Sequence, residues 1–228
     1  MAPRITLIHA VTVAMGPVQA AFRVLWPEAS CTNLLEDALG PDRERDGALT
    51  DAMSDRIGAL ADYAVSTGAA GILFTCSAFG PAIERAAARL PVPVLKPNEA
   101  MFEAALDAGD KVGMLATFAP AVTGMEDEFR AMARQAGRAG AAIRTVCVPA
   151  AMAALRDGDV ETHNRLLAEA APALAGCDAV ILAHFSTAPA EAAVSSALGR
   201  PVQTSPAAAV RKIRKAVELS RPVQAAVL

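Results

Sequence analysis

Short, unbroken hydrophobic runs recur along the chain and are separated by longer segments of mixed polarity. Runs such as 70–76 and 178–184 are typical of strands that are buried on both faces of a sheet. Mixed segments such as 51–65 and 161–174 place apolar residues at helical spacing. Strands that alternate with helices of this length predict parallel sheets with right-handed crossovers. We predict strands at 4–9, 29–35, 70–76, 92–96, 111–117, 142–148, 178–184 and 201–204.

The second half of the chain repeats features of the first. Residues 71–84 read GILFTCSAFGPAIE and residues 179–191 read AVILAHFSTAPAE, so both predict a strand, a loop of small residues and a proline that opens a helix. Three landmarks in the two halves are each 108 residues apart. They are Cys76 and His184, Pro81 and Pro189, and Pro93 and Pro201.

The repeat predicts an α/β fold with two pseudo-symmetric lobes, each a mostly parallel four-stranded sheet flanked by helices. We place the N-terminal lobe at 1–98 and the C-terminal lobe at 99–228, with a candidate active site in the cleft between them. Residues 96–109 are predicted to form a helix that leads from one lobe into the other. The C-terminal helix is a candidate to pack back on the first lobe.

Composition excludes several classes of protein. With 54% hydrophobic and 20% charged residues, the chain is not generally disordered. A net charge of −3 and one basic cluster, at 211–215, argue against nucleic-acid binding, and we interpret that cluster as a solvated helix face, with an anion or partner patch as the alternative. The uncharged stretch 63–83 contains glycines and a proline, which favours a buried strand and loop over a membrane span.

The four cysteines show no metal-ligand spacing, so we expect no metal and reduced thiols in a cytoplasmic protein. Three of them, Cys31, Cys147 and Cys177, are interpreted as structural. His163 lies in a polar helical segment and is expected to face solvent. The high apolar content is compatible with a homo-oligomer.

Cys76 and His184 are the candidate catalytic residues. In parallel α/β sheets ligands bind beyond the carboxyl ends of the strands, and both residues lie at such an end. If the lobes pack face to face, the two side chains lie on opposite walls of one cleft. Their ordinary pKa values of about 8.5 and 6.5 suit a pair that removes a proton from one face of a substrate and returns one to the other.

Residues near these two positions are candidates for binding a substrate carboxylate. The loops that follow Cys76 and His184 offer backbone N–H groups at helix N-termini, which suit an anion. His9 and Thr117 end the first strand of each half. The predicted substrate-binding residues are Ser77, Ala78, Thr117, Phe118, Phe185, Ser186 and His9.

The two related halves, the Thr-Cys-Ser sequence at 75–77 and the sequence VGMLAT at 112–117 resemble the aspartate/glutamate/hydantoin racemase superfamily, which includes arylmalonate decarboxylase and maleate cis–trans isomerase. The similarity covers about residues 4–215. It implies cofactor-independent chemistry, in which racemases commonly use two facing cysteines. By position Cys76 matches the first of these and His184 stands in place of the second.

The resemblance also bears on carboxylate binding. Thr117 matches a threonine of the carboxylate-binding loop, and Ser77 occupies the place of a polar residue that is often Asn in the racemases. The chain departs from the racemase pattern in two places. The loop after Cys76 reads Ser-Ala rather than Asn-Thr, and the second cysteine is absent.

These observations predict a cofactor-independent racemase or isomerase of a small carboxylic acid. Cys76, as a thiolate, and protonated His184 would act on opposite faces of the substrate. Two alternatives are an arylmalonate-type decarboxylase, which needs one proton donor, and a maleate-type cis–trans isomerase, in which Cys76 adds to a double bond. A third is a non-catalytic protein that binds small acids. A thiol hydrolase would instead need the two side chains within hydrogen-bond reach.

Overall fold

The computed structural model describes residues 2–220, which fall into two compact units. Within the described residues, one unit contains 2–96 together with 209–220, and the other is Pro97–Ala208. The observed division therefore lies two residues before the predicted boundary at 98/99. It also assigns most of the last helix to the first unit, whereas the predicted second lobe ran to the C-terminus.

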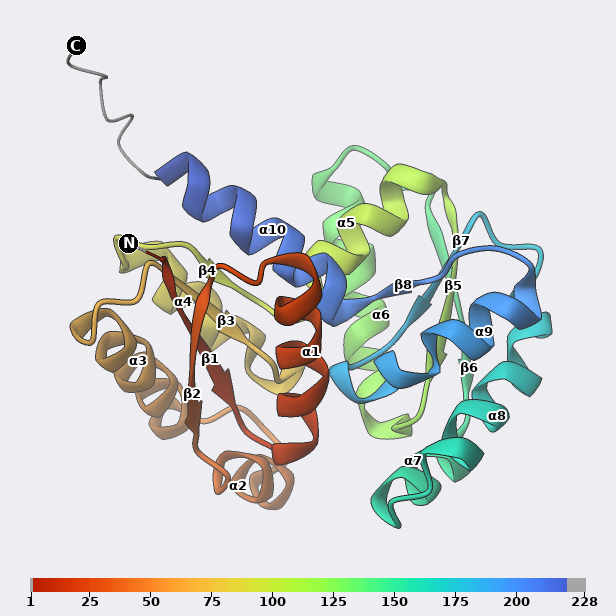
Figure 1. Cartoon of the computed structure of the whole chain (residues 1–228), viewed down its shortest axis with the longest axis horizontal. Coiled ribbons are helices and arrows are strands. Elements are labelled where there is room, and N and C mark those ends of the chain that lie inside the picture. Colours follow the sequence, from red (N-terminus) through yellow and green to blue (C-terminus); the bar gives the residue numbers. More distant parts are fainter. Residues whose placement is uncertain (1, 221–228) are drawn as a thin grey trace. The chain divides into compact units, whose positions relative to one another are not determined.

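Both units contain a four-stranded parallel sheet with the same strand order (Figure 1). The order is β2-β1-β3-β4 in the first sheet and β6-β5-β7-β8 in the second. The pairing register is also equivalent, because Ile5 on β1 aligns with Gly71 on β3 while Val112 on β5 aligns with Ala179 on β7. The predicted α/β fold class is confirmed, and all eight predicted strands are present, β1 with the predicted bounds and the other seven shorter than predicted.

Helices connect successive strands of the first unit, as parallel pairing requires. Helix α3 begins where the Thr50 side chain accepts a hydrogen bond from the backbone N–H of Met53, and α4 begins with Pro81 in its first turn. The elements of this unit are β1 (Arg4–His9), η1 (Thr12–Ala14), α1 (Met15–Leu25), β2 (Ser30–Leu35), α2 (Leu39–Asp46), α3 (Asp51–Ser66), β3 (Gly71–Phe74), the 3-10 turn η2 (Ser77–Phe79), α4 (Gly80–Arg89), β4 (Val94–Leu95) and α10 (Ser205–Ser220).

The second unit follows the same plan. Its elements are α5 (Glu99–Ala108), β5 (Lys111–Ala116), α6 (Ala119–Gln135), β6 (Ala142–Cys147), α7 (Pro149–Arg156), α8 (Val160–Ala170), η3 (Ala171–Leu174), β7 (Ala179–Leu182), η4 (Phe185–Ala190), α9 (Glu191–Leu198) and β8 (Gln203–Thr204). Two predictions about prolines and helices need correction. Pro172 lies in η3, so the helix predicted at 161–174 ends as a 3-10 turn, and Pro189 lies inside η4 instead of opening an α-helix.

The first sheet is covered on both faces. Helices α3 and α4 pack their apolar sides, including Ile57 and Ile83, against Ile72 of β3 and its neighbours. Helix α10 packs close to Gly71, because a Cβ atom built on Gly71 would lie 2.8 Å from Cγ2 of Val217 and 3.1 Å from Cδ1 of Ile213. Gly71 therefore permits a close approach of helix and strand that any larger residue would obstruct.

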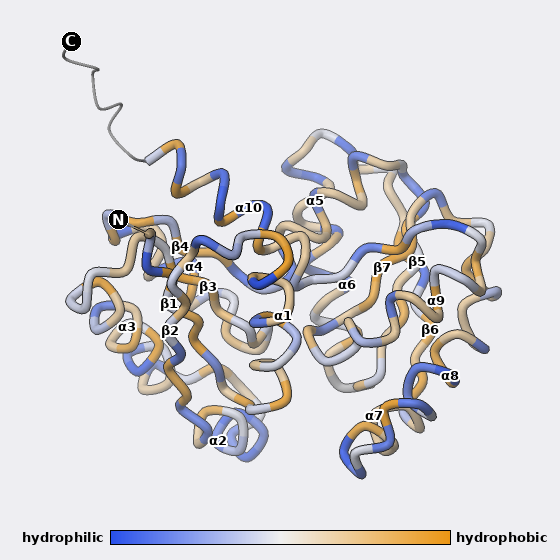
Figure 2. The backbone as a smooth tube through the Cα atoms, viewed as in Figure 1, coloured by the Kyte–Doolittle hydropathy of each residue, from blue (hydrophilic) through white to orange (hydrophobic). Residues whose placement is uncertain are grey.

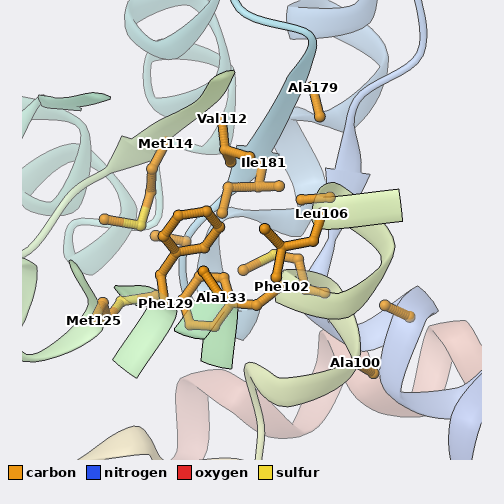
Figure 3. Close-up of a cluster of buried hydrophobic side chains, with 14 of the residues drawn as sticks. Ala100, Phe102, Leu106, Val112, Met114, Met125, Phe129, Ala133, Ala179 and Ile181 are labelled. Atoms are coloured by element: carbon orange, nitrogen blue, oxygen red, sulfur yellow. The ribbon is translucent and has the colours of Figure 1, made fainter. Parts of the chain in front are cut away.

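The second sheet is also covered by helices on both faces. On one face, α5 and α6 pack Phe102 and Phe129 edge to face, with ring centres 5.7 Å apart, against Val112 and Ile181 of the strands (Figure 3). Helices α7, α8 and α9 cover the other face. Figure 2 shows the matching hydropathy pattern in both units, in which the central strands are hydrophobic. By contrast, α2 of the first unit carries hydrophilic residues.

His163 was predicted to face solvent, and this is wrong. Its side chain is 0% exposed on the inner face of α8. It lies one helical turn before the buried Leu167, so the same face of α8 that buries Leu167 also buries His163. The polar neighbours Glu161 and Arg165 point outward and made the segment look solvated.

No helix within residues 2–220 is both long enough and apolar enough to cross a membrane.

Candidate active site

Cys76 and His184 occupy equivalent positions in the two sheets. Each lies two residues beyond the end of its strand, β3 or β7, and each is the residue that immediately precedes a 3-10 turn, η2 or η4. The carboxyl edge of each sheet therefore presents one of the two predicted acid–base groups.

The Cys76 thiol is largely buried, and burial raises its pKa above the ordinary value. Two opposing influences are weaker. The backbone N–H of Ala78 donates a hydrogen bond to the sulfur, and the positive charge of Arg43 favours the thiolate. Arg43 comes from α2, and its Nε lies 3.5 Å from the carbonyl oxygen of Ala78. The thiol is therefore protonated in this environment, with the groups that would stabilise its anion nearby.

His9 lies beside the Cys76 strand in a chain of hydrogen bonds. Its Nδ1 is 2.9 Å from Oγ1 of Thr75, and its Nε2 is 3.0 Å from Oδ1 of Asn33. Asn33 Oδ1 also accepts a hydrogen bond of 3.2 Å from Nε2 of Gln19 on α1. The His9 side chain is 1% exposed, and burial lowers its pKa more strongly than the Asn33 hydrogen bond raises it. Both ring nitrogens of His9 are thus engaged within the protein.

His184 adopts an unusual backbone conformation, with φ +69° and ψ 155°. It is the one residue other than glycine with positive φ among residues 2–220. This region of φ/ψ space is populated essentially by glycine, and holding another residue there costs on the order of 1–3 kcal/mol. The hydroxyl of the fully buried Thr187 lies 2.9 Å from the His184 carbonyl oxygen and also contacts the Ala183 carbonyl oxygen, which helps to hold this corner.

Burial lowers the pKa of His184 to about 4. Its Nε2 atom is buried without a hydrogen-bond partner. The imidazole is therefore neutral near pH 7, and its Nε2 is free to form a hydrogen bond with a ligand.

Thr117, which immediately follows the neighbouring strand β5, also has a buried polar atom without a hydrogen-bond partner. Its Oγ1 is buried without a partner, and its side chain is 1% exposed. Leu115 on β5 pairs with Leu182 on β7, so Thr117 and His184 each lie two residues beyond a paired position at the same sheet edge. An unpaired buried polar group is costly and calls for an explanation. Two such groups at one edge indicate a place where an external polar ligand would be stabilised.

The protonation states differ from those predicted. A thiolate at Cys76 and an imidazolium at His184 were expected, but burial favours the neutral form of each side chain. The sequence showed the residue types and their ordinary pKa values, whereas the shift depends on how completely the folded chain removes each group from water.

The remaining predicted residues lie at the same two sheet edges. In the first unit, Ser77 is half-buried and Ala78 is exposed, both in η2. In the second unit Phe118 is 40% exposed, while Phe185 and Ser186 are buried in η4. Nothing among residues 2–220 groups three or more His, Cys, Asp or Glu side chains in a way that could hold a metal ion.

Four residues near the candidate site were not predicted. Thr75, Asn33 and Gln19 complete the His9 network, and Arg43 supplies the charge near Cys76. Thr75 could have been found because it directly precedes Cys76, whereas Asn33 is one of three polar residues in β2 and did not stand out. Arg43 gave no signal, because only the packing of α2 brings it near η2.

The comparisons with known proteins agree with this fold. A protein-family model described as Asp/Glu/Hydantoin racemase matches residues 15–213. A comparison with curated protein sequences finds no significant match.

Several solved structures share the fold at low sequence identity. Allantoin racemase from Klebsiella pneumoniae is 18% identical with a TM-score of 0.63, and the match covers 96% of this chain and 89% of that one. Glutamate racemase from Thermus thermophilus is 23% identical with a TM-score of 0.67, covering 96% of this chain and 81% of that one. Unliganded arylmalonate decarboxylase is 17% identical with a TM-score of 0.61, covering 94% and 93%.

Proposed function

Because the chain belongs to the Asp/Glu/hydantoin racemase family, we propose that it is an isomerase that racemises or epimerises a small carboxylic acid by proton transfer at the α-carbon. Cys76 and His184 form the acid–base pair and act on opposite faces of the substrate. The reaction uses the side chains of this chain and no cofactor.

One observation carries the proposal. Cys76 and His184 hold equivalent positions at the carboxyl edges of two sheets with the same strand order. Ligands of parallel α/β sheets bind at such edges. A thiol and an imidazole that reach one substrate from two equivalent edges can approach it from two sides. That is the requirement for inverting a stereocentre.

The neutral forms of the two side chains support one direction of proton transfer in the proposed reaction. Nε2 of His184, which has no hydrogen-bond partner, accepts the α-proton, and the electron pair of the C–H bond passes into the substrate carboxylate as an enediolate. The Cys76 thiol then donates its proton to the opposite face of the α-carbon. The product is the other enantiomer, and the protein is left with a thiolate and an imidazolium that exchange protons with water before the next turnover.

The enediolate needs hydrogen-bond donors. The Thr117 hydroxyl has no hydrogen-bond partner among residues 2–220 and can donate to one carboxylate oxygen. Backbone N–H groups of η2, including that of Ser77, are candidates for the other oxygen. Arg43 supports the thiolate that forms when Cys76 loses its proton.

The protonated thiol also favours a second candidate function. In the decarboxylation of a malonate-type acid, the carbon–carbon bond breaks, carbon dioxide leaves, and the enediolate that remains needs a single proton donor. Cys76 meets this need in its protonated state, and His184 would then have no catalytic role. A cis–trans isomerisation would start from the thiolate, which burial of Cys76 disfavours.

The test is a proton-NMR assay in D₂O with purified protein and a panel of chiral amino acids, hydroxy acids, aryl malonates and maleate. We expect deuterium at the α-carbon of one compound class, with racemisation, and we expect Cys76→Ala and His184→Ala each to abolish racemisation. The Cys31→Ala variant, which removes another free cysteine of the first unit, is the matched control and retains activity.

Other outcomes are equally specific. Release of carbon dioxide that depends on Cys76 but not on His184 establishes the decarboxylase. Binding of a panel compound with no reaction, unchanged in both variants, contradicts the proposal and supports a protein that only binds small acids.

A further inference from the structure

The hydrogen bonds around His9 assign its tautomer. Gln19 Nε2 can only donate, so the atom of Asn33 that it contacts is the amide oxygen, an acceptor. His9 Nε2 contacts the same oxygen and must therefore carry a proton. His9 Nδ1 is then a lone-pair acceptor, and the hydroxyl of Thr75 donates to it.

The Thr75 hydroxyl has a second acceptor within reach. Its Oγ1 lies 3.4 Å from the carbonyl oxygen of Ile8, against 2.9 Å from His9 Nδ1. The shorter bond makes His9 the preferred partner. The two side chains that hydrogen-bond with His9, Asn33 on β2 and Thr75 just after β3, are uncharged, as is Gln19, which donates to Asn33.

We propose that His9 is a positioning residue for Cys76, acting through Thr75, rather than a residue that contacts substrate. Thr75 is the last residue before Cys76, and the His9 bond fixes its side chain at the corner where β3 turns into η2. The role of the thiol in catalysis rests on the function proposed above, but the effect on the thiol itself does not.

The corner between β3 and η2 matters because it places the backbone N–H of Ala78 beside the Cys76 sulfur. The backbone N–H of Ala78 donates to the Cys76 sulfur, and this bond favours the thiolate against the effect of burial. Thr75 holds the chain immediately before Cys76, and Ala78 meets the sulfur from two residues after it. If Thr75 loses its anchor, the corner gains freedom and the Ala78 hydrogen bond weakens. The thiol should then become harder to ionise.

The experiment measures Cys76 directly and needs no substrate. Intact protein is treated with iodoacetamide across a pH range, and alkylation of the Cys76 peptide is followed by mass spectrometry, which separates it from Cys31, Cys147 and Cys177. Only the thiolate reacts, so the pH midpoint of the rate reports the thiol pKa.

Two His9 variants separate the two hydrogen bonds. His9→Asn places an amide oxygen near the Nδ1 position and keeps an acceptor for Thr75, whereas His9→Gln places an amide N–H near the Nε2 position and keeps a donor for Asn33. Thr75→Val removes the hydroxyl at nearly constant shape, and Thr75→Ser retains it. The matched control is Thr6→Val, which removes a buried threonine hydroxyl of β1 whose hydrogen-bond partner is Thr32 on β2.

We expect Thr75→Val and His9→Gln to slow alkylation of Cys76 at pH 7.5 by about 3- to 10-fold, the scale of one weakened hydrogen bond to a charged group. The pH midpoint of Cys76 alkylation should rise equally in Thr75→Val and His9→Gln. The variant that carries both substitutions should show no further rise. His9→Asn, Thr75→Ser and Thr6→Val should stay within about twofold of the native rate.

Equal slowing by His9→Asn and His9→Gln would overturn the inference, because it would show a general packing effect. So would a native midpoint in Thr75→Val. Either result leaves the proposed reaction untouched, since that is decided by isotope exchange into substrate. Failure of isotope exchange in the native protein, conversely, leaves the alkylation result standing.

Discussion

The backbone of His184 makes a quantitative prediction about stability. At φ +69° and ψ 155° a residue with a Cβ atom is strained, and glycine is not. Substituting His184 with alanine removes the imidazole but keeps the strain. Substituting it with glycine removes both. The comparison of the two variants therefore isolates the strain from the loss of the side chain.

The magnitude follows from two opposing effects. Relief of the strained conformation favours the glycine variant by on the order of 1–3 kcal/mol. The greater freedom of glycine in the unfolded chain favours the alanine variant by about 0.5–1 kcal/mol. The difference spans about 0–2.5 kcal/mol in favour of His184→Gly, the reverse of the usual order. Both variants should be inactive in the proposed reaction.

The assay is urea unfolding monitored by circular dichroism. The free energies of unfolding are compared between variants that show the same dependence on urea concentration. Ala78→Gly, at an exposed position in the equivalent turn η2, is the matched control, and it should lose about 0.5–1 kcal/mol. An alanine variant that is more stable than the glycine variant, as at an ordinary position, would show that this corner is not strained.

Three further predictions concern buried groups. The pKa of His184 is about 4 in the folded protein and 6.5 ordinarily, so the unfolded chain binds the proton first as the pH falls. The free energy of unfolding should therefore be highest above about pH 6.5 and drop by up to about 3 kcal/mol toward pH 4. A His184→Phe variant, measured by urea unfolding, should show a weaker dependence on pH. Gly71→Ala should destabilise the protein by about 1–3 kcal/mol, because the added methyl group would press against Val217. A second substitution, Val217→Ala, should recover part of the loss. An unchanged melting temperature in Gly71→Ala would contradict this packing. His163→Leu should be close to neutral, because it removes the buried Nε2 that has no partner together with the 2.8 Å bond between Nδ1 and Oδ1 of Asn164. Leu167→Ala on the same helix face should cost about 2–5 kcal/mol on thermal unfolding. An equally large loss in His163→Leu would contradict the unpartnered state of Nε2.

The arrangement of strands could be predicted from the sequence because the signal is local. Apolar runs such as 71–74 and 179–182 are buried on both faces, so their hydrophobicity is unbroken. The repeat then fixed the equivalence of Cys76 and His184, since a constant spacing of landmarks implies a common order of elements. Strand ends were placed less well, because β4 and β8 pair over two residues each.

The environment of the site could not be predicted in the same way. The contact of His9 with Asn33 and Thr75 joins three strands, and the charge of Arg43 reaches Cys76 through the packing of α2. The burial of His163 depends on the rotation of α8 about its axis, which its polar neighbours disguised. Protonation states follow from such contacts, so the neutral thiol and imidazole became evident only in the folded chain.

The central claim is that Cys76 and His184 exchange protons with one carbon atom from opposite sides. The most direct measurement starts from one pure enantiomer of the compound identified by isotope exchange and follows both chirality and deuterium content in D₂O. We predict that the native protein forms the opposite enantiomer with one deuterium at the α-carbon, and that neither Cys76→Ala nor His184→Ala interconverts the enantiomers. Racemisation that persists in either variant would contradict it.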